Sequence, residues 1–351
     1  LLLFVANLFC ASAQKWYTPE IDQKVEDLLK QMTVEEKLGY IGGVNWMYTK
    51  SIDRLGIHRM KMSDGPQGLG TDGKSTAYPS TVTLAATWNE NLAYQYGKAL
   101  GRDCRARNVN VILGPAVNIY RAPMCGRNFE YMGEDPYLTS RICVGYIKGV
   151  QDQGVMATVK HFVANNSDYD RNNISNDIDE RTLNEIYFPA YKAAIQEAEV
   201  GAVMTSYNLM NGIYTTENPW LLKEVLRNQW GFKGLVMSDW GSTHYCVPAA
   251  KGGLDLEMAG GEKMNPKDMA YYLKTGDVTM DMVDEKVRHI LRILIAFGFK
   301  DGTQADKNIP LDDPKSAETA LNVAREGLVL LKNENNILPL NPKKYKHIIV
   351  T

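Results

Sequence analysis

Apolar residues recur along this chain with two different spacings. Short runs rich in β-branched residues recur at 109–113, 155–162, 201–207, 234–240 and 254–258, and stretches with helical apolar spacing lie between them. Strands that alternate with helices predict parallel pairing, because a parallel neighbour is reached only through a crossover connection. About 280 residues of such units favour an α/β fold built as a (β/α)8 TIM-type barrel over an open doubly wound sheet. No Gly-x-Gly-x-x-Gly motif follows the early strands, which argues against dinucleotide binding.

The helical stretches are marked by their apolar faces and by their start signals. Thr33 followed by Glu36 forms a capping box that opens one helix. Apolar residues at intervals of three and four predict further helices over residues 20–32, 180–198, 219–230, 279–297 and 316–327.

Composition changes after residue 300, where a polar segment follows the helix at 279–297. We therefore predict a catalytic barrel over residues 14–300, a linker over 301–315 and the start of a second domain over 316–351. The strand-like residues 347–351 have no partner strand after them, so we expect the second domain to be truncated.

The first residues form an apolar run that ends in Ala11-Ser12-Ala13. This pattern is typical of a secretory signal with a small-residue cleavage site, so residues 1–13 are interpreted as a signal remnant and the protein as secreted or periplasmic. The alternative is a buried first helix. A membrane span needs about 20 apolar residues, and this run is too short.

Charge and cysteine content narrow the possible partners. The chain has 39 basic and 41 acidic residues, a net charge of −2 and no long run of like charge, so nucleic acid is an unexpected partner. Cys104, Cys125, Cys143 and Cys246 show no metal-site spacing, so we assign no metal ligand and expect separate buried thiols. The oligomeric state is not predicted.

Polar side chains close several of the predicted strands. In an α/β barrel the residues just past the carboxyl ends of the strands line the mouth of the active site. Lys160 and His161 close one strand, Tyr207 the next, and Asp239 with Trp240 another. Asp64 follows the apolar residues at 60–63 in the same way.

This set suits the hydrolysis of glycosides. A retaining glycosidase needs one carboxylate to attack the sugar and a second carboxyl group about 5 to 5.5 Å away to protonate the leaving oxygen. Asp239 fits the first role, with Trp240 beside it to stack on a ring, and we expect Arg127 and Lys160 to lower its pKa. Groups able to bind the vicinal hydroxyls of a sugar are also present, namely Asp64, Arg127, Lys160 and His161. The reaction needs no cofactor.

Each of these residues also has a structural explanation. Asp239 could be a helix N-cap and Asp64 could cap a turn, because Asp is common at both places. Lys160 and His161 could simply face solvent. Only the combination of these residues indicates a site.

Several longer segments carry a resemblance to one known family. They read SDGPQG at 63–68, GRNFEYMGEDP at 126–136, VKHFVANN at 159–166, SYN at 206–208, VMSDWG at 236–241, and AREG and LLKN at 324–327 and 330–333. These segments, in this order, resemble those of glycoside hydrolase family 3. The resemblance extends from about residue 20 to the end of the chain.

The resemblance implies that Asp239 is the catalytic nucleophile. It further implies a sugar subsite made of Asp64, Arg127, Lys160, His161, Arg171, Tyr207 and Trp240. It implies a second domain of the α/β sandwich type that supplies a Glu as general acid/base, expected beyond Thr351, so neither Glu326 nor Glu334 is assigned this role.

The resemblance also distinguishes branches of the family. The β-N-acetylhexosaminidases use a His on the loop after the Lys-His strand, and residues 165–173 contain none. The Asp239-Trp240 pair is similar to the β-glucosidase and β-xylosidase branch. We therefore expect an exo-acting β-glucosidase that cleaves small oligosaccharides or glycosides. A β-xylosidase and a catalytically inactive carbohydrate-binding homologue are the alternatives.

Overall fold

The computed structural model describes residues 16–70, 73–302, 304–345 and 347–349, so the predicted signal remnant at 1–13 lies outside the described residues. At its centre is a parallel sheet with the strand order β10-β7-β5-β4-β3. In chain order its strands are β3 (Met62–Asp64), β4 (Val111–Leu113), β5 (Met156–Phe162), β7 (Ala202–Thr205) and β10 (Leu235–Met237). Every residue of β4, β5, β7 and β10 is buried, as expected for parallel strands covered on both faces.

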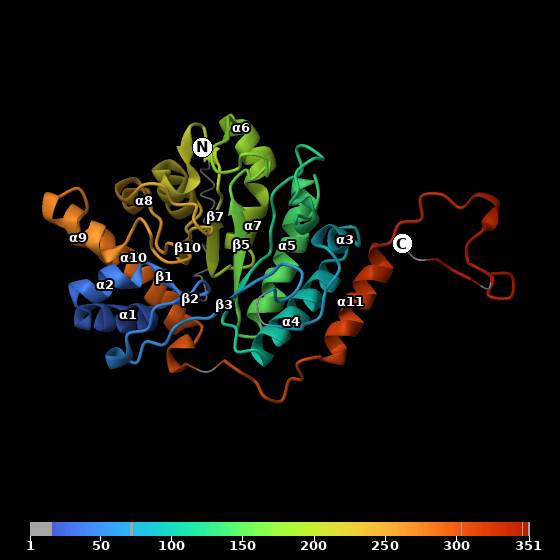
Figure 1. Cartoon of the computed structure of the whole chain (residues 1–351), viewed down its shortest axis with the longest axis horizontal. Helices are drawn as coiled ribbons and strands as arrows, with labels where there is room; N and C mark the ends of the chain where they lie inside the picture. Colours follow the sequence, from blue (N-terminus) through green and yellow to red (C-terminus); the bar gives the residue numbers. More distant parts are fainter. Residues whose placement is uncertain (1–15, 71–72, 303, 346, 350–351) are drawn as a thin grey trace, which may run out of the picture.

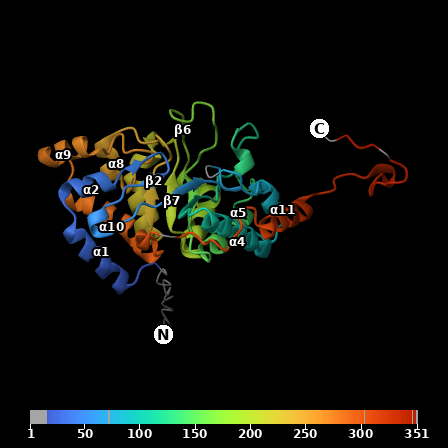
Figure 2. The ribbon, with the colours of Figure 1, turned by 60° about the horizontal axis from the view of Figure 1, so that its bottom comes forward.

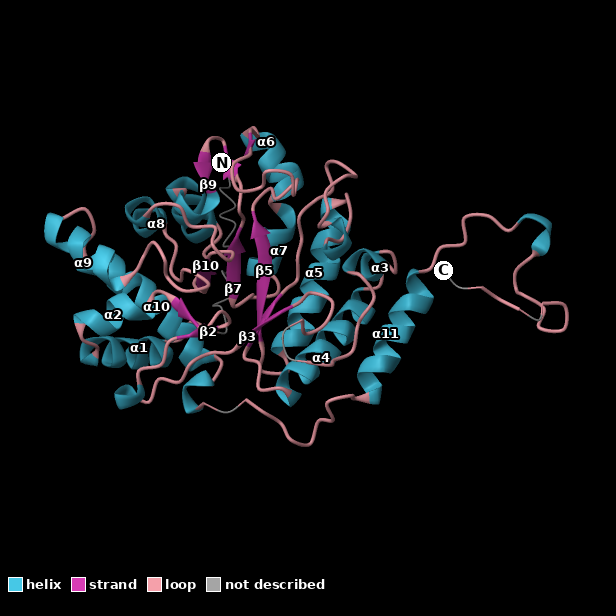
Figure 3. Cartoon of the chain, in the orientation of Figure 1, coloured by secondary structure: helices cyan, strands magenta, loops and turns pink. Residues whose placement is uncertain are grey.

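Helices surround this sheet (Figures 1 and 3). They are α1 (Pro19–Gln31), α2 (Val34–Tyr40), α3 (Thr81–Ala85), α4 (Glu90–Ala106), α5 (Pro136–Gln151), α6 (Glu180–Thr182), α7 (Pro189–Gln196), α8 (Cys246–Gly252), α9 (Pro266–Thr275), α10 (Met280–Ala296) and α11 (Pro314–Gly327). The helices α4 and α5 lie in close contact because Gly149 faces α4, where an added Cβ would come within 2.1 Å of the Tyr94 carbonyl oxygen. Any side chain at this position would force the two helices apart.

Pairing continues beyond both edges of the five-stranded sheet. Residues 254–258 contact β10 through the Met237–Leu256 bridge and the segment before β1 (Gly43–Val44) through the Gly42–Glu257 bridge. The strand β2 (Tyr48–Thr49) pairs antiparallel with β1 and reaches the residue before β3 through the Tyr48–Lys61 bridge. The predicted α/β class is confirmed and the fold is consistent with a TIM-type domain, but the assigned sheet of the described residues does not close into a barrel.

A second, small sheet stands at the carboxyl end of the central strands. It consists of β6 (Ser175–Asn176), β8 (Leu209–Met210) and β9 (Ile213–Tyr214). Figure 2 shows that the loops carrying β6 project away from the central sheet on this side.

Three predicted elements differ from the structure. Residues 254–258 form isolated bridges rather than a regular strand. The helix predicted over 180–198 is divided into α6, a π-helical turn η3 (Leu183–Tyr187) and α7, because Pro189 cannot donate to the preceding turn. Of the strand predicted over 347–351, residues 347–349 form no strand. Residues 350 and 351 lie outside the described residues.

Two further predicted helices are present with shifted ends or a different type. The helix predicted over 219–230 is the π-helical segment η5 (Trp220–Gln229), and the one predicted over 316–327 begins earlier, as α11. Three short 3-10 turns, η1 (Asp53–Leu55), η4 (Thr215–Glu217) and η6 (Phe299–Asp301), connect other elements.

The helix α11 packs against the barrel-like domain on α3 and α4. Glu326 accepts a hydrogen bond of 2.7 Å from the Asn89 amide, and Ser316 donates one of 2.7 Å to Asp103. After α11 the chain leaves the body of the molecule, and it includes one short turn, η7 (Glu334–Asn336) (Figure 1). The division into domains at 301–315 stays a prediction. None of the described helices has the length and apolar character that a membrane crossing requires.

A buried ionic network fixes the start of β10. Asp255 is 2% exposed and accepts hydrogen bonds from Arg227 at 2.6 Å, from His289 at 2.8 Å and from the Val236 backbone N–H at 2.8 Å. Burial raises the pKa of Asp255, but the charge of Arg227 and the contact with His289 outweigh it and hold that pKa below its usual value. The network joins η5, β10 and α10 around one carboxylate.

We predict that Asp255→Ala lowers the free energy of unfolding by about 3 to 5 kcal/mol, because it leaves the Arg227 charge buried without its partner. Urea denaturation followed by circular dichroism measures the change. The control is Glu185→Ala, which removes a carboxylate from the solvent-exposed Arg181–Glu185 pair and is expected to have little effect. Equal losses in the two variants would contradict the role given to the network.

Candidate active site

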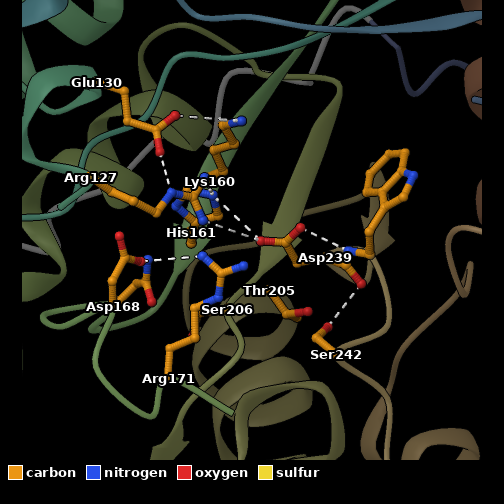
Figure 4. Close-up of polar contacts among 12 residues, drawn as sticks. Arg127, Glu130, Lys160, His161, Asp168, Arg171, Thr205, Ser206, Asp239 and Ser242 are labelled. Carbon is orange, nitrogen blue, oxygen red and sulfur yellow. Dashed lines mark hydrogen bonds and ion pairs between the residues drawn. The ribbon is translucent and has the colours of Figure 1, made fainter.

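Charged side chains gather where the carboxyl ends of the central strands meet (Figure 4). Lys160 and His161 belong to β5, and Asp239 comes two residues after β10. Arg127 lies on the long loop after β4, directly before the short turn η2 (Asn128–Glu130). Parallel strands bring these distant segments together, because all their carboxyl ends lie at the same edge of the sheet.

Asp239 is an enclosed carboxylate at this edge, with a side chain that is 10% exposed. Its Oδ1 accepts a hydrogen bond of 2.7 Å from the Trp240 backbone N–H. Its Oδ2 lies 3.8 Å from Arg127 Nη1 and 3.5 Å from His161 Nε2, and has no hydrogen-bond partner among the residues described. Ser242 fixes the backbone of Asp239, because its N–H and its hydroxyl both donate to the Asp239 carbonyl oxygen.

The pKa of Asp239 is raised above its usual value, which differs from the prediction. Burial is the largest cause and outweighs the opposing charges of Arg127 and Lys160 and the hydrogen bonds from Trp240 and Tyr207. The expected cationic neighbours are present and act in the expected direction. The sequence did not reveal how completely the carboxylate is removed from water.

Glu130 is a member of the cluster that the analysis of the sequence did not single out. It is 4% exposed and accepts a hydrogen bond from Arg127 Nε, and its second oxygen lies 3.8 Å from Lys160 Nζ. Its carboxylate thus offsets the two cations that flank Asp239. The spacing of three residues between Arg127 and Glu130 was the available signal, because one turn brings such residues together.

Asp64 lies at the open side of the cluster. Its side chain is 59% exposed and its Oδ1 lies 3.4 Å from Lys160 Nζ. A cavity of about 440 Å³ begins here, and its wall includes Asp64, Glu130 and Phe129. Asp64 therefore stands where a soluble ligand would first contact the charged groups.

Tyr207 and Arg171 form the opposite side. Tyr207 follows β7 and is close enough to Asp239 for its hydroxyl to lower the carboxyl pKa. The Arg171 guanidinium lies 4.4 Å from the centre of the Tyr207 ring and 3.2 Å from an oxygen of Asp168. Asp168, which the sequence analysis also did not single out, holds Arg171 over the ring.

Trp240 supplies an aromatic face beside Asp239. Its indole N–H donates a hydrogen bond of 2.8 Å to the Trp46 carbonyl oxygen, which fixes the ring against the turn between β1 and β2. Trp46 itself is 65% exposed. The indoles of Trp46 and Trp240 thus border the cluster near the turn between β1 and β2.

His161 is fully buried between Arg127 and the segment after β4. Burial holds the pKa of His161 well below its usual value. The positive charges of Arg127, Lys160 and Arg171 lower that pKa further. It is therefore a neutral imidazole.

All eight residues predicted from the sequence lie in one connected set of contacts. They are Asp64, Arg127, Lys160, His161, Arg171, Tyr207, Asp239 and Trp240. Their individual roles remain predictions. Within the residues that the structure describes, no group of three or more His, Cys, Asp or Glu side chains could hold a metal ion.

The arrangement has clear chemical consequences. A buried carboxylate oxygen without a hydrogen bond can attack an electrophilic carbon, and nearby cations can stabilise negative charge as it shifts. The surrounding donors and acceptors match the hydroxyl groups of a sugar.

Comparison with known proteins agrees with this geometry. The Glycosyl hydrolase family 3 N terminal domain matches residues 31–293. A Beta-glucosidase of Rhizobium radiobacter is 42% identical over 93% of this chain and 40% of its own length. Thermostable beta-glucosidase B of Acetivibrio thermocellus is 40% identical over 90% of this chain and 43% of its own length.

Solved structures give the same picture. Beta-glucosidase 3B from Thermotoga neapolitana, in complex with alpha-D-glucose, superimposes with a TM-score of 0.84 and 37% identity. That alignment covers 91% of this chain and 48% of the other. The chain therefore spans less than half the length of these relatives.

The raised pKa of Asp239 leads to a prediction about stability. Between the unfolded and folded pKa values the folded state binds the additional proton, so stability is lost as pH rises through the folded pKa. We therefore expect Asp239→Asn to raise the melting temperature at neutral pH, because it removes a charge that burial disfavours.

Differential scanning calorimetry at neutral pH and near pH 4 measures this effect. The gain should shrink at the lower pH, where the wild-type carboxyl group is increasingly protonated. The control is Asp268→Asn, which alters an aspartate outside the cluster that accepts a hydrogen bond from the Asn265 amide. A lower melting temperature for Asp239→Asn at neutral pH would contradict the raised pKa.

Proposed function

Because this chain belongs to glycosyl hydrolase family 3, with a β-glucosidase-like N-terminal domain, we propose that it carries the nucleophile and sugar subsite of a retaining, exo-acting β-glucosidase. The substrate would be a terminal, non-reducing β-D-glucosyl residue of a small oligosaccharide or glycoside. The proposal depends above all on the position of Asp239, whose Oδ2 lies within 3.8 Å of both Arg127 Nη1 and His161 Nε2.

In the proposed reaction Asp239 Oδ2 attacks C1 of the glucosyl residue and the bond from C1 to the aglycone oxygen breaks. The aglycone oxygen takes a proton from a general acid, and a glycosyl ester on Asp239 results. Water then attacks C1, gives its proton to the same group and releases glucose with retained configuration. No cofactor takes part.

The cations around Asp239 have two tasks in this scheme. Arg127 and Lys160 oppose the effect of burial, so that a larger fraction of the carboxylate is ionised and ready to attack. As the ester forms, the negative charge on Asp239 disappears, and Glu130 keeps the remaining positive charge balanced.

The sugar hydroxyls are proposed to bind the exposed edge of the cluster. Asp64 and Lys160 offer an acceptor and a donor that are already paired at 3.4 Å, a distance that a vicinal diol can bridge. Arg171 and Tyr207 would bind from the other side, and the Trp240 ring would stack on the sugar or on the aglycone.

The general acid is proposed to be a Glu outside this chain's sequence. Glu130 is committed to Arg127 and Lys160, and Asp64 to Lys160, so neither of these nearby carboxylates is free to act as the proton donor. This part of the proposal rests on the family resemblance.

The nucleophile can be tested by trapping. We expect a 2-deoxy-2-fluoro-β-glucoside with a good leaving group to inactivate the full-length protein, because the fluorine slows both formation and hydrolysis of the ester while the good leaving group restores the rate of formation. Peptide mapping by mass spectrometry should place the label on Asp239. Asp239→Ala should take up no label and lose activity on aryl β-glucosides by roughly a thousandfold or more.

The matched control for trapping is Glu134→Gln, an exposed carboxylate on the same loop as Arg127, which should be labelled like the wild type. A label on any other carboxylate would end the assignment of Asp239. The rates on aryl β-glucosides and aryl β-xylosides, compared in the same assay, distinguish the β-glucosidase from the β-xylosidase alternative.

Glu130 provides a second prediction. Glu130→Gln keeps the shape of the side chain but removes the charge that anchors Arg127 Nε, so we expect kcat/KM to fall by about tenfold to a hundredfold. Glu134→Gln serves again as the control and should keep wild-type kinetics. Unchanged kcat/KM in Glu130→Gln would show that Arg127 needs no such anchor.

A further inference from the structure

Asn118 holds the backbone of His161 on both sides. Its Oδ1 accepts a hydrogen bond of 2.8 Å from the His161 N–H, and its Nδ2 donates one of 2.9 Å to the His161 carbonyl oxygen. The chain brings it there because the segment after β4 continues to pair with β5, through the Ala116–Lys160 bridge and the bond from Val117 N–H to the Lys160 carbonyl. Asn118 is 2% exposed.

These two bonds decide which way the amide of Asn118 points. The opposite orientation would set the amide nitrogen against the His161 N–H and the amide oxygen against the carbonyl oxygen. Oδ1 is therefore an acceptor where it also approaches His161 Nδ1, at 3.3 Å. A ring nitrogen that faces an acceptor is favoured to carry the proton, because it can then donate a hydrogen bond.

The other ring nitrogen faces a donor. Arg127 Nη2 lies 2.7 Å from His161 Nε2, and a guanidinium group can only donate. Nε2 must therefore accept, which requires it to have no proton. Protonation on Nε2 would create a donor facing a donor there and a lone pair facing Asn118 Oδ1 on the other side.

The third neighbour of the ring fits the same assignment. The Tyr131 hydroxyl lies 3.3 Å from His161 Nδ1 and itself accepts a hydrogen bond of 2.8 Å from the Asn165 amide. Its oxygen can therefore receive the Nδ1 proton as well. Asp239 Oδ2 is an acceptor on the Nε2 side, but at 3.5 Å it lies farther from Nε2 than the Arg127 donor does at 2.7 Å, so the Arg127 contact decides the tautomer.

We propose that Asn118 is a positioning residue, which fixes His161 as the neutral tautomer protonated on Nδ1 and thereby holds the Arg127 guanidinium beside Asp239. With Nε bound to Glu130 and Nη2 to His161, the remaining Nη1 faces Asp239 Oδ2 at 3.8 Å. Its effect on catalysis rests on the proposed function, but the tautomer itself does not.

Two consequences follow for the site. The 3.5 Å contact between His161 Nε2 and Asp239 Oδ2 is not an ion pair, because no proton lies between the two atoms. His161 also has no proton on the side that faces the sugar, so it cannot protonate the aglycone. Any sugar hydroxyl that reaches Nε2 must donate to it.

The charged and titratable groups around His161 favour the neutral ring. Arg127, Lys160 and Arg171 are cations that disfavour a second proton on the ring. Asp239 is the nearby anion, and Tyr131 and Tyr191 contact the ring and the backbone carbonyl as neutral hydroxyls, because burial raises the pKa of both. Glu130 acts on the ring only through Arg127.

The tautomer can be measured directly by ¹⁵N NMR of the full-length protein labelled on histidine, with His161→Gln used to assign the signals. We expect a neutral ring with the proton on Nδ1 and no titration between about pH 5 and 8. A proton on Nε2, or an imidazolium in this range, would overturn the proposal whether or not the enzyme is a β-glucosidase.

Two substitutions separate positioning from mere support of the backbone. Asn118→Leu removes the amide, so kcat should fall by about tenfold to a hundredfold at every pH, with a smaller change in KM. Asn118→Asp sets a carboxylate beside Nδ1 and favours the imidazolium, whose Nε2 proton would push Arg127 away. Its activity should therefore be lowest at acidic pH and recover as pH rises.

The control is Asn110→Leu, a buried Asn just before β4 that also binds backbone, through a hydrogen bond of 2.8 Å from the Lys61 N–H, but lies far from the cluster. It should lose stability and keep the wild-type pH profile. If Asn118→Asp and Asn118→Leu show the same pH-independent loss, Asn118 only supports the backbone. Should a variant fail to fold, the wild-type NMR result still decides the tautomer.

Discussion

The candidate active site depends on the balance of charge among side chains that are largely removed from water. Arg127 and Lys160 are cations with little exposure, and such groups are stable only where carboxylates face them. Glu130 and Asp64 provide part of this compensation, and Asp239 completes it. The other carboxylates hold the cations, and among the described residues Oδ2 of Asp239 has no hydrogen-bond partner, which suits the nucleophilic role proposed for it.

This balance requires a rigid support, and β10 shows how it is provided. Near its start, Asp255 binds Arg227, His289 and the backbone of Val236. The charges there are fully paired, and the carboxyl pKa is lowered. Beyond its end, Asp239 has a raised pKa and, among the described residues, an oxygen without a hydrogen bond. The same strand is thus held by a stabilising network near its start and is followed by a charge that burial disfavours, as expected if a rigid scaffold supports the proposed nucleophile.

The neutral ring of His161 connects these charges without adding one. It lies between Asn118, which faces its protonated nitrogen, and Arg127, which faces its lone pair. A cationic ring in place of this neutral one would add a third positive charge next to Arg127 and Lys160. The positions of Asn118 and His161 follow from pairing between the segment after β4 and β5, so the parallel sheet determines the protonation as well as the geometry.

The sequence alone determined the α/β class, the family and the polar residues at the strand ends, because apolar spacing and local motifs are properties of short segments. Asp239, Lys160 and Tyr207 could be found in this way, since each directly follows or closes an apolar run. Only the tertiary structure decided that Glu130 and Asn118 belong to the site, that residues 254–258 form bridges rather than a regular strand, and that burial raises the pKa of Asp239. These features depend on the distance between segments far apart in the chain and on the exclusion of water, and neither quantity is encoded in a local pattern.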